Sequence, residues 1–187
     1  IDASERRNRL LTAQAEIWKR NKPRQRIVVA GTTAAFPAMK ELVKTVLELP
    51  SGEVYLAGLD KSLSEEDWAE IDETHPQFEL KELLDYLKLE RAGVAEAAEP
   101  ANPEAEAFIA EVMRPAGVSD KWLDLPRRGF SPQAWGGISL VNCTDIREEA
   151  LGIALIMREA LEEEGKTAAL VTSDRNLARR VANELER

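Results

Sequence analysis

The sequence contains almost none of the residues that form covalent cross-links or bind soft metals. Of its 187 residues, one is a cysteine, Cys143, and one is a histidine, His75. These counts exclude an internal disulfide framework, a cysteine-clustered zinc or iron–sulfur site and a histidine-rich metal site. No apolar run approaches the roughly 18–20 residues that a membrane span needs. We therefore expect no membrane insertion, no signal peptide and a cytoplasmic protein.

The composition is that of a folded, acidic protein. Hydrophobic residues make up 44% of the chain, which suffices for a core, and the net charge is −9. Collagen-like and wholly disordered classes are therefore excluded. Residues 1–30 are basic, with eight Lys or Arg against three Asp or Glu. This stretch can contact phosphate, although a solvated helix face is the more common meaning of such a run. The acidic remainder predicts weak binding to nucleic acid.

Short β-branched runs alternate with helical periodicity, which predicts an α/β fold with parallel strands and flanking helices. Two of the runs are joined by a helix that begins near Pro37, and a strand–helix–strand unit of this kind is right-handed by default. The middle of the chain, 62–125, is predicted to be mainly helical. The predicted strands lie near residues 27–31, 53–57, 138–142 and 167–171.

The sequence lacks both Gly-x-x-x-x-Gly-Lys-Ser/Thr and Gly-x-Gly-x-x-Gly. The residues Thr32 and Thr33 follow the first strand and can line an anion-binding turn, but a plain strand-to-helix turn explains them as well. Asp60 follows the second strand as either a metal ligand or, more commonly, a turn residue. His75 precedes a proline and has no triad partner in the sequence, so we interpret it as a turn residue.

Two residues near the C-terminus are further candidates for contact with phosphate. Ser173 and Arg175 follow the last predicted strand and open the last predicted helix, which also carries Arg179 and Arg180. A solvated helix face is the alternative interpretation of these arginines. Cys143 ends the third predicted strand, and we expect it to be buried and inert.

The order of the segments resembles the AddB subunit, of alphaproteobacterial type, of the AddAB ATP-dependent helicase–nucleases that act in DNA double-strand-break repair. The segments that carry this resemblance are Ile27-Val28-Val29-Ala30-Gly31-Thr32-Thr33-Ala34-Ala35-Phe36-Pro37, Gly52-Glu53-Val54-Tyr55-Leu56-Ala57-Gly58-Leu59-Asp60, His75-Pro76-Gln77, Arg114-Pro115-Ala116, Arg147-Glu148-Glu149-Ala150 and Thr167–Val181. The helical stretch from Leu10-Leu11 to Trp18 and the basic break after it also fit. The resemblance extends over nearly the whole chain, and the segments are specific when taken together and in order.

The resemblance implies a degenerate RecA-like, superfamily-1 helicase fold with a helical insertion. The implied domains are 1–91, the end of a first RecA-like half; 92–137, a linker and helical connection; and 138–187, the start of a second half. We accordingly expect the chain to be an excerpt of a longer protein. The nuclease carboxylates and iron–sulfur cysteines of such proteins would lie beyond residue 187.

On the same resemblance, the residues of a helicase motor are replaced. An active motor has adjacent Asp and Glu where this chain has Ala30-Gly31, and an arginine is often found where it has Thr172. No glutamine sensor follows the second strand near Asp60. We therefore expect no catalytic residues, no metal site and no cofactor in this segment.

The function implied is that of a non-catalytic scaffold within a DNA-repair complex. It would contact an AddA-type helicase–nuclease subunit and, in the full complex, single-stranded DNA, with Thr32, Thr33, Ser173 and Arg175 as the candidate contacts. Two alternatives from other classes remain: an active P-loop-type nucleotide-binding enzyme fragment, and a plain α/β protein-interaction domain.

Overall fold

The structure is a computed structural model that describes residues 2–125 and 129–186. The chain divides into two compact units, Ile1–Gly136 and Gly137–Arg187, which we call the N-terminal and C-terminal units. Each is described by itself. The predicted connection over 92–137 includes residues 126–128, which lie outside the described residues. The other two predicted domains, 1–91 and 138–187, include residues 1 and 187, which are also not among the described residues.

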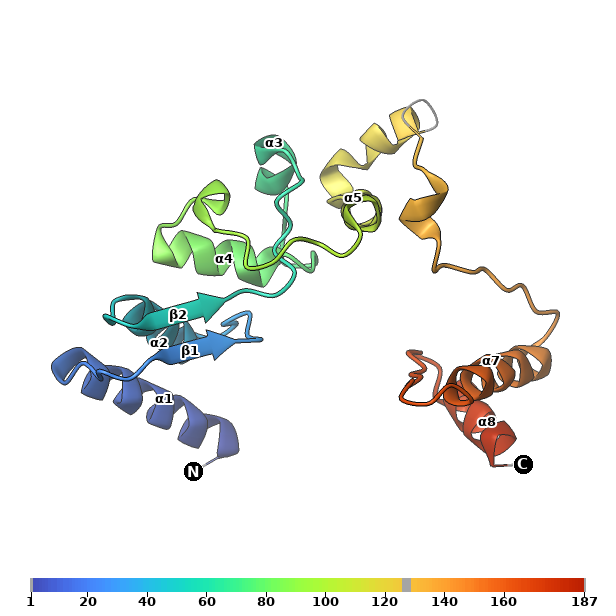
Figure 1. Cartoon of the computed structure of the whole chain (residues 1–187), viewed down its shortest axis with the longest axis horizontal. Coiled ribbons are helices and arrows are strands. Elements are labelled where there is room, and N and C mark those ends of the chain that lie inside the picture. The colour runs from blue at the N-terminus through green and yellow to red at the C-terminus, as the bar shows by residue number, and fades with distance from the viewer. Residues whose placement is uncertain (1, 126–128, 187) are drawn as a thin grey trace. The chain divides into compact units, whose positions relative to one another are not determined.

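The described parts of the chain are mostly helical, with one parallel pair of strands (Figure 1). The elements of the N-terminal unit are α1 (Ala3–Arg20), β1 (Ile27–Ala30), α2 (Pro37–Leu47), β2 (Gly52–Tyr55), α3 (Glu65–Ala69), α4 (Phe78–Leu87), η1 (Arg91–Gly93), α5 (Pro103–Val112), η2 (Ala116–Asp124) and η3 (Pro132–Trp135). The C-terminal unit contains α7 (Ile146–Leu161) and α8 (Arg175–Leu185). The helical middle of the chain is as predicted.

The first two predicted strands form and pair in parallel, as expected. β1 lies beside β2 in a register that pairs Ile27 with Gly52 and Ala30 with Tyr55. The helix α2 joins them, and Pro37 occupies its first turn, where a missing N–H costs nothing. The fold is therefore mixed α/β, with the parallel sheet that the sequence predicts at this position.

Apolar side chains of α2 hold the sheet from one side. Val43 is fully buried and packs with Val29 of β1 and Val54 of β2. The start of β2 also approaches the end of α2 closely, since a Cβ added to Gly52 would lie 1.8 Å from the carbonyl oxygen of Val46. Only glycine fits there, so this residue fixes how the strand leaves the helix.

The helix α4 connects the sheet to the helical middle of the chain. Its Leu83 is fully buried with Val43 and Ala34, while Leu84 packs in a second cluster with Trp68. The two leucines are adjacent in sequence and lie on neighbouring parts of the buried helix face. Through them, α4 is held against the loops that follow β1 and β2.

The two strands predicted over 138–142 and 167–171 are absent from the structure. Both segments are irregular, and the apolar side chains of Leu140 and Val171 are 87% and 94% exposed. A strand needs a neighbour for its backbone N–H and C=O groups, and two strands alone are marginally stable. Within the described residues neither segment has such a neighbour. Instead, α7 packs on α8 through Ala150 and Val181.

None of the helices in residues 2–125 and 129–186 has the length and apolar character needed to cross a membrane.

Candidate nucleic-acid interface

The loop after β1 carries the first two candidate DNA contacts in a fixed conformation. Gly31 and Ala34 both have positive φ angles, of 71° and 53°. The buried Ala34 donates its backbone N–H to the Thr32 hydroxyl oxygen at 3.0 Å. This short contact satisfies a buried donor and closes the turn that leads into α2. Because Thr32 Oγ1 accepts here, its own proton points elsewhere and can be donated to a ligand.

The second threonine of this loop is not free to receive an anion. Thr33 donates its hydroxyl to the carboxylate of Glu79, near the start of α4. A carboxylate at this point repels phosphate, so the loop lacks the electrostatics of an anion nest. One cation lies close by, because the Arg7 guanidinium of α1 stacks over the Phe36 ring at 4.5 Å from its centroid.

The loop after β2 is held by a glutamine for which the sequence predicted no role. Gln77 donates its side-chain N–H to the carbonyl of Gly58 at 2.7 Å and accepts the backbone N–H of Asp60 at 3.1 Å. Both polar ends of the amide are thus used by the backbone. The residue lies just before α4, so the same helix that carries Glu79 also fixes this second loop.

Asp60 is a turn residue, which was the more common of its two interpretations. Its Oδ1 accepts from the N–H and hydroxyl of Ser62, both at 2.7 Å, and from the N–H of Leu63 at 3.2 Å. Arg91 secures the same turn by donating to the carbonyls of Asp60 and Leu63 at 2.9 and 2.6 Å. Three donors on one carboxylate oxygen stabilise the turn and leave that oxygen with no room for a metal ion.

The other two candidate contacts lie in the C-terminal unit, at the start of α8. Both Ser173 and Arg175 are exposed, and neither side chain forms a hydrogen bond or ion pair with any described residue. The helix end itself is capped by Asp174, whose carboxylate accepts the N–H groups of Asn176 and Leu177 at 2.7 and 3.3 Å. An acidic cap occupies the donors that would otherwise bind phosphate.

The four predicted contacts therefore fall into two pairs, one in each unit, and the structure describes each pair separately. Arg179 differs from the second pair, because its guanidinium donates to the side-chain oxygen of Asn176 at 3.0 Å on the surface of α8. Cys143 is half-buried rather than buried. Desolvation, followed by the nearby Glu148, raises the pKa of its thiol, so the thiolate is disfavoured.

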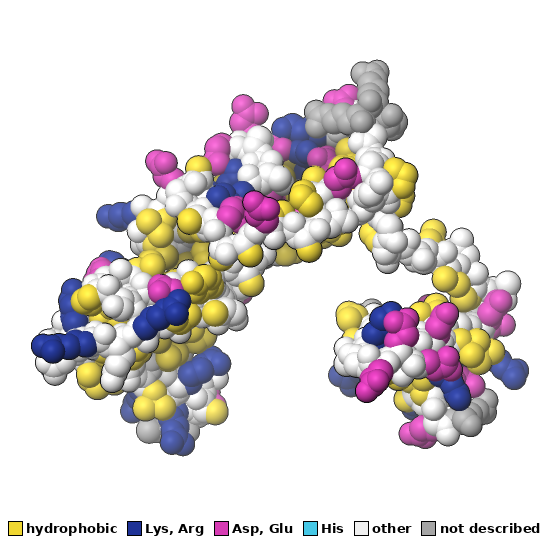
Figure 2. All heavy atoms as spheres, viewed as in Figure 1, with side chains coloured by type: hydrophobic (Ala, Val, Ile, Leu, Met, Phe, Trp, Pro, Cys, Tyr) yellow, Lys and Arg dark blue, Asp and Glu magenta, His cyan; other side chains and the backbone are white. Residues whose placement is uncertain are grey.

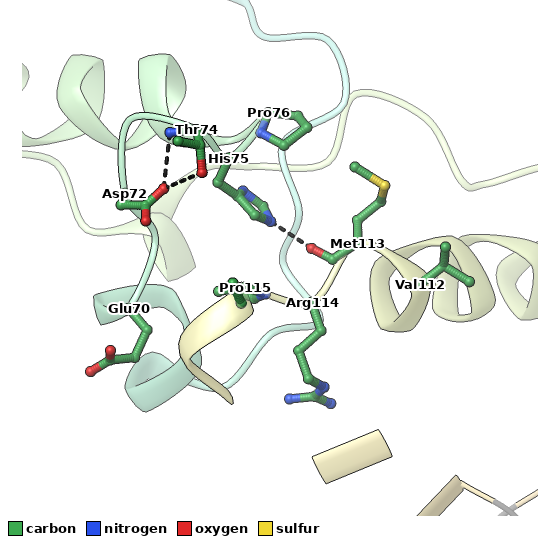
Figure 3. Close-up of a pocket in the computed structure, with 10 residues that line it drawn as sticks. Glu70, Asp72, Thr74, His75, Pro76, Val112, Met113, Arg114 and Pro115 are labelled. Atoms are coloured by element: carbon green, nitrogen blue, oxygen red, sulfur yellow. Dashed lines mark hydrogen bonds between the residues drawn. The ribbon is translucent and has the colours of Figure 1, made fainter. Parts of the chain in front are cut away.

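A pocket of about 160 Å³ lies beside His75 (Figure 3). The ring is held on both sides: Nδ1 accepts from the backbone N–H of Gln77 at 3.1 Å, and Nε2 lies 2.5 Å from the carbonyl of Met113. Nδ1 accepts and Nε2 donates in this arrangement, so backbone groups use both ring nitrogens. The lining includes neither serine nor cysteine, and Thr74 donates its hydroxyl to Asp72 at 2.6 Å. His75 thus acts as a turn residue, as predicted.

The pocket borders a buried group of charges with a structural role. Arg114 points away from the pocket in Figure 3 and pairs with Asp67 and Glu111. Lys121 also donates to Asp67. Desolvation raises the pKa of the Asp67 carboxyl, but the Lys121 hydrogen bond and the Arg114 charge outweigh it, so its pKa lies below the ordinary range. The charges are matched within the group, which leaves none for a ligand.

In residues 2–125 and 129–186, no three His, Cys, Asp or Glu side chains are grouped so that they could hold a metal ion. The chain was also compared with known proteins. No family model, no curated protein and no solved structure matches it.

Proposed function

We propose that this chain is a non-catalytic, helicase-like segment of an AddB-type subunit in a DNA-repair helicase–nuclease. In this proposal it supports an AddA-type partner and contributes only weak contacts to single-stranded DNA. The degenerate RecA-like fold is part of the proposal. It is supported by the parallel β1–α2–β2 unit, a connection that RecA-like cores share with other parallel α/β folds.

One observation carries the proposal: the carboxylate of Asp60 and the amide of Gln77, beyond the carboxyl ends of β1 and β2, are committed to the fold. Ligands of parallel α/β sheets bind at this edge. Here Ala30 ends β1 and Gly31 follows it, so no carboxylate stands at that point. Asp60 is held in its own turn, and Gln77 is used by the backbone. Phosphoryl transfer depends on positioned charges around the phosphates and magnesium. An edge of this kind favours a scaffold over a motor.

A nucleotide-binding enzyme is disfavoured by the same residues. The hydroxyl of Thr33, which would face a phosphate, is bonded to the carboxylate of Glu79. A protein-interaction domain without DNA contact is the stronger alternative. It is favoured by the many large apolar side chains that remain exposed, including Leu140, Val171 and Leu123.

Three measurements on the same purified chain test the proposal. We expect no magnesium-dependent ATP hydrolysis, and single-stranded DNA binding weaker than roughly micromolar at physiological salt, because the net charge is −9. We also expect an AddA-type subunit to be retained on the immobilised chain. ATP turnover that is abolished by Asp60→Asn would contradict the proposal, as would nanomolar DNA binding. Failure to retain the partner would also contradict it, whereas retention of the partner with undetectable DNA binding would favour the interaction-domain alternative.

The DNA contribution has its own matched pair of variants. Arg175→Ala removes an exposed cation at the start of α8, whereas Arg179→Ala removes one that is bonded to Asn176. If the C-terminal unit contacts phosphate where predicted, Arg175→Ala weakens DNA binding and lowers its salt dependence more than Arg179→Ala does. Equal effects would place the contact elsewhere.

A further inference from the structure

The helix α1 has a second apolar strip on the side opposite its packing face. It packs in the N-terminal unit through Ala15, which is fully buried, while Leu10 and Ile17 are 61% and 55% exposed. These two residues are seven apart, so they lie on one side of the helix two turns from each other, with the exposed Ala13 between them. This spacing is that of a helix that packs against another helix.

Arginines border this strip on α1. Arg6 lies one turn before Leu10, Arg20 lies one turn after Ile17, and Arg9 lies beside Ala13; all three are exposed. Arg9 pairs with Glu5 at 2.6 Å and Arg20 with Glu16 at 3.9 Å, within the same helix. Three arginines against these two glutamates leave the border with a net positive charge. This charge predicts that an occupant of the strip is an amphipathic helix with acidic edges.

The helix α7 of the same chain presents such a surface. It packs on α8 through Ala150 and Ala154, and its outer side carries Leu151 and Leu155, which are 47% and 58% exposed. They are four residues apart and therefore adjacent on the helix surface. In Figure 2, hydrophobic side chains lie beside Lys and Arg over α1, and beside both Asp or Glu and Lys or Arg over the C-terminal unit.

Glutamates border the outer strip of α7. Glu159 lies one turn beyond Leu155, and Glu162 lies two turns beyond it. Both are exposed, and neither pairs with any described residue. Arg158 lies along the opposite edge of the strip. The α7 strip is therefore acidic along one edge, which matches the arginine edge of the α1 strip.

From this complementarity we propose that the occupant is a second copy of this chain. The α1 strip of each copy lies on the α7 strip of the other, in a closed two-fold dimer. A stable interface buries about 1,200–2,000 Å² in total, more than a single helix-on-helix contact provides. The reciprocal arrangement doubles the contact, and salt weakens it because its borders are charged.

The first test measures mass as a function of concentration on the full chain, by sedimentation equilibrium at low and high salt. We expect a monomer–dimer equilibrium that shifts toward monomer in high salt. The variants Arg6→Glu/Arg9→Glu/Arg20→Glu and Glu159→Lys/Glu162→Lys should each raise the dissociation constant by tenfold or more. Arg24→Glu, an exposed change outside the strip, is the charge control and should leave it unchanged.

The decisive test is rescue. An equal mixture of the α1 triple variant and the α7 double variant forms a mixed dimer in which both contacts again join opposite charges. All five substitutions combined in one chain should likewise restore a homodimer. Circular dichroism checks that every variant is folded. A monomer at all concentrations, an unlimited rise in mass, a dimer indifferent to both variants, or failure of rescue would each overturn the proposal.

Discussion

Replacing Arg114 with methionine should strongly destabilise the N-terminal unit. The guanidinium is 7% exposed and binds Glu111 through two hydrogen bonds, at 2.8 and 2.6 Å, as well as the carboxylate of Asp67. Asp67 is 4% exposed and Glu111 is 14% exposed. Methionine keeps most of the aliphatic volume and removes the charge. Two carboxylates are then left in a site from which water is largely excluded.

The expected loss follows from the charges that remain. Removing one member of a buried ion pair costs about 3–5 kcal/mol, because its partner stays buried and unpaired. Lys121 is 38% exposed and still reaches Asp67, so part of the attraction survives. We therefore expect the lower end, about 3 kcal/mol. That is a large share of the 5–15 kcal/mol typical of a domain.

Urea titration with tryptophan fluorescence measures this loss in one unit alone. All four tryptophans, Trp18, Trp68, Trp122 and Trp135, lie in the N-terminal unit. The matched control is Arg9→Met, since the Arg9–Glu5 pair is exposed on both sides and such pairs add little to stability. The reasoning is refuted if Arg114→Met unfolds at the same urea concentration as the control.

Four further outcomes are expected. The pKa of Asp67 is lowered in the folded state, so its contribution to stability is full above about pH 4 and is lost as pH falls through the lowered pKa. The urea midpoint of Arg114→Met should therefore fall less steeply with decreasing pH than that of the unsubstituted chain. Gly52→Ala places a Cβ 1.8 Å from a backbone oxygen and should cost at least about 2 kcal/mol by the same titration. Gln77→Leu loses two hydrogen bonds and should cost about 1–2 kcal/mol. Val171→Asp, at a side chain 94% exposed, should leave the thermal midpoint of the C-terminal unit, followed by circular dichroism, unchanged; a marked drop would mean that the segment is buried in a sheet.

The sequence predicted those parts of the fold that depend on local patterns. The run Ile27–Ala30 ends at a glycine, and Pro37 opens the following helix, so the β1–α2–β2 unit could be read from the chain. The N-cap of α8 depends on equally local contacts, because Asp174 accepts the N–H groups of Asn176 and Leu177. The turn at Asp60 belongs to the same class, because its partners lie two and three residues away.

The candidate site was only partly predictable, because its decisive contacts are distant in sequence. Thr33 meets Glu79 across 46 residues, and Gln77 reaches Gly58 across 19. The acceptor Glu79 belongs to α4, and the donor Gln77 is the residue before that helix. The periodicity of the sequence shows only which face of α4 is buried. Nothing in the pattern around Thr33 indicates that its hydroxyl is already bonded to a carboxylate. The anion-binding hypothesis depended on this point.

The two pairs of strand-like runs show why composition alone does not determine a sheet. Ile27–Ala30 and the run over 138–141 are both mostly apolar, yet only the first becomes a strand. The difference lies in the connecting helix. α2 offers the bulky Val43 to both of its strands, which holds them together as a covered pair. α7 instead directs Ala150 and Ala154 toward α8, and small side chains let two helices approach closely. With its inner face used by a helix, α7 cannot cover a sheet, and the runs on either side of it remain without a neighbour to pair with.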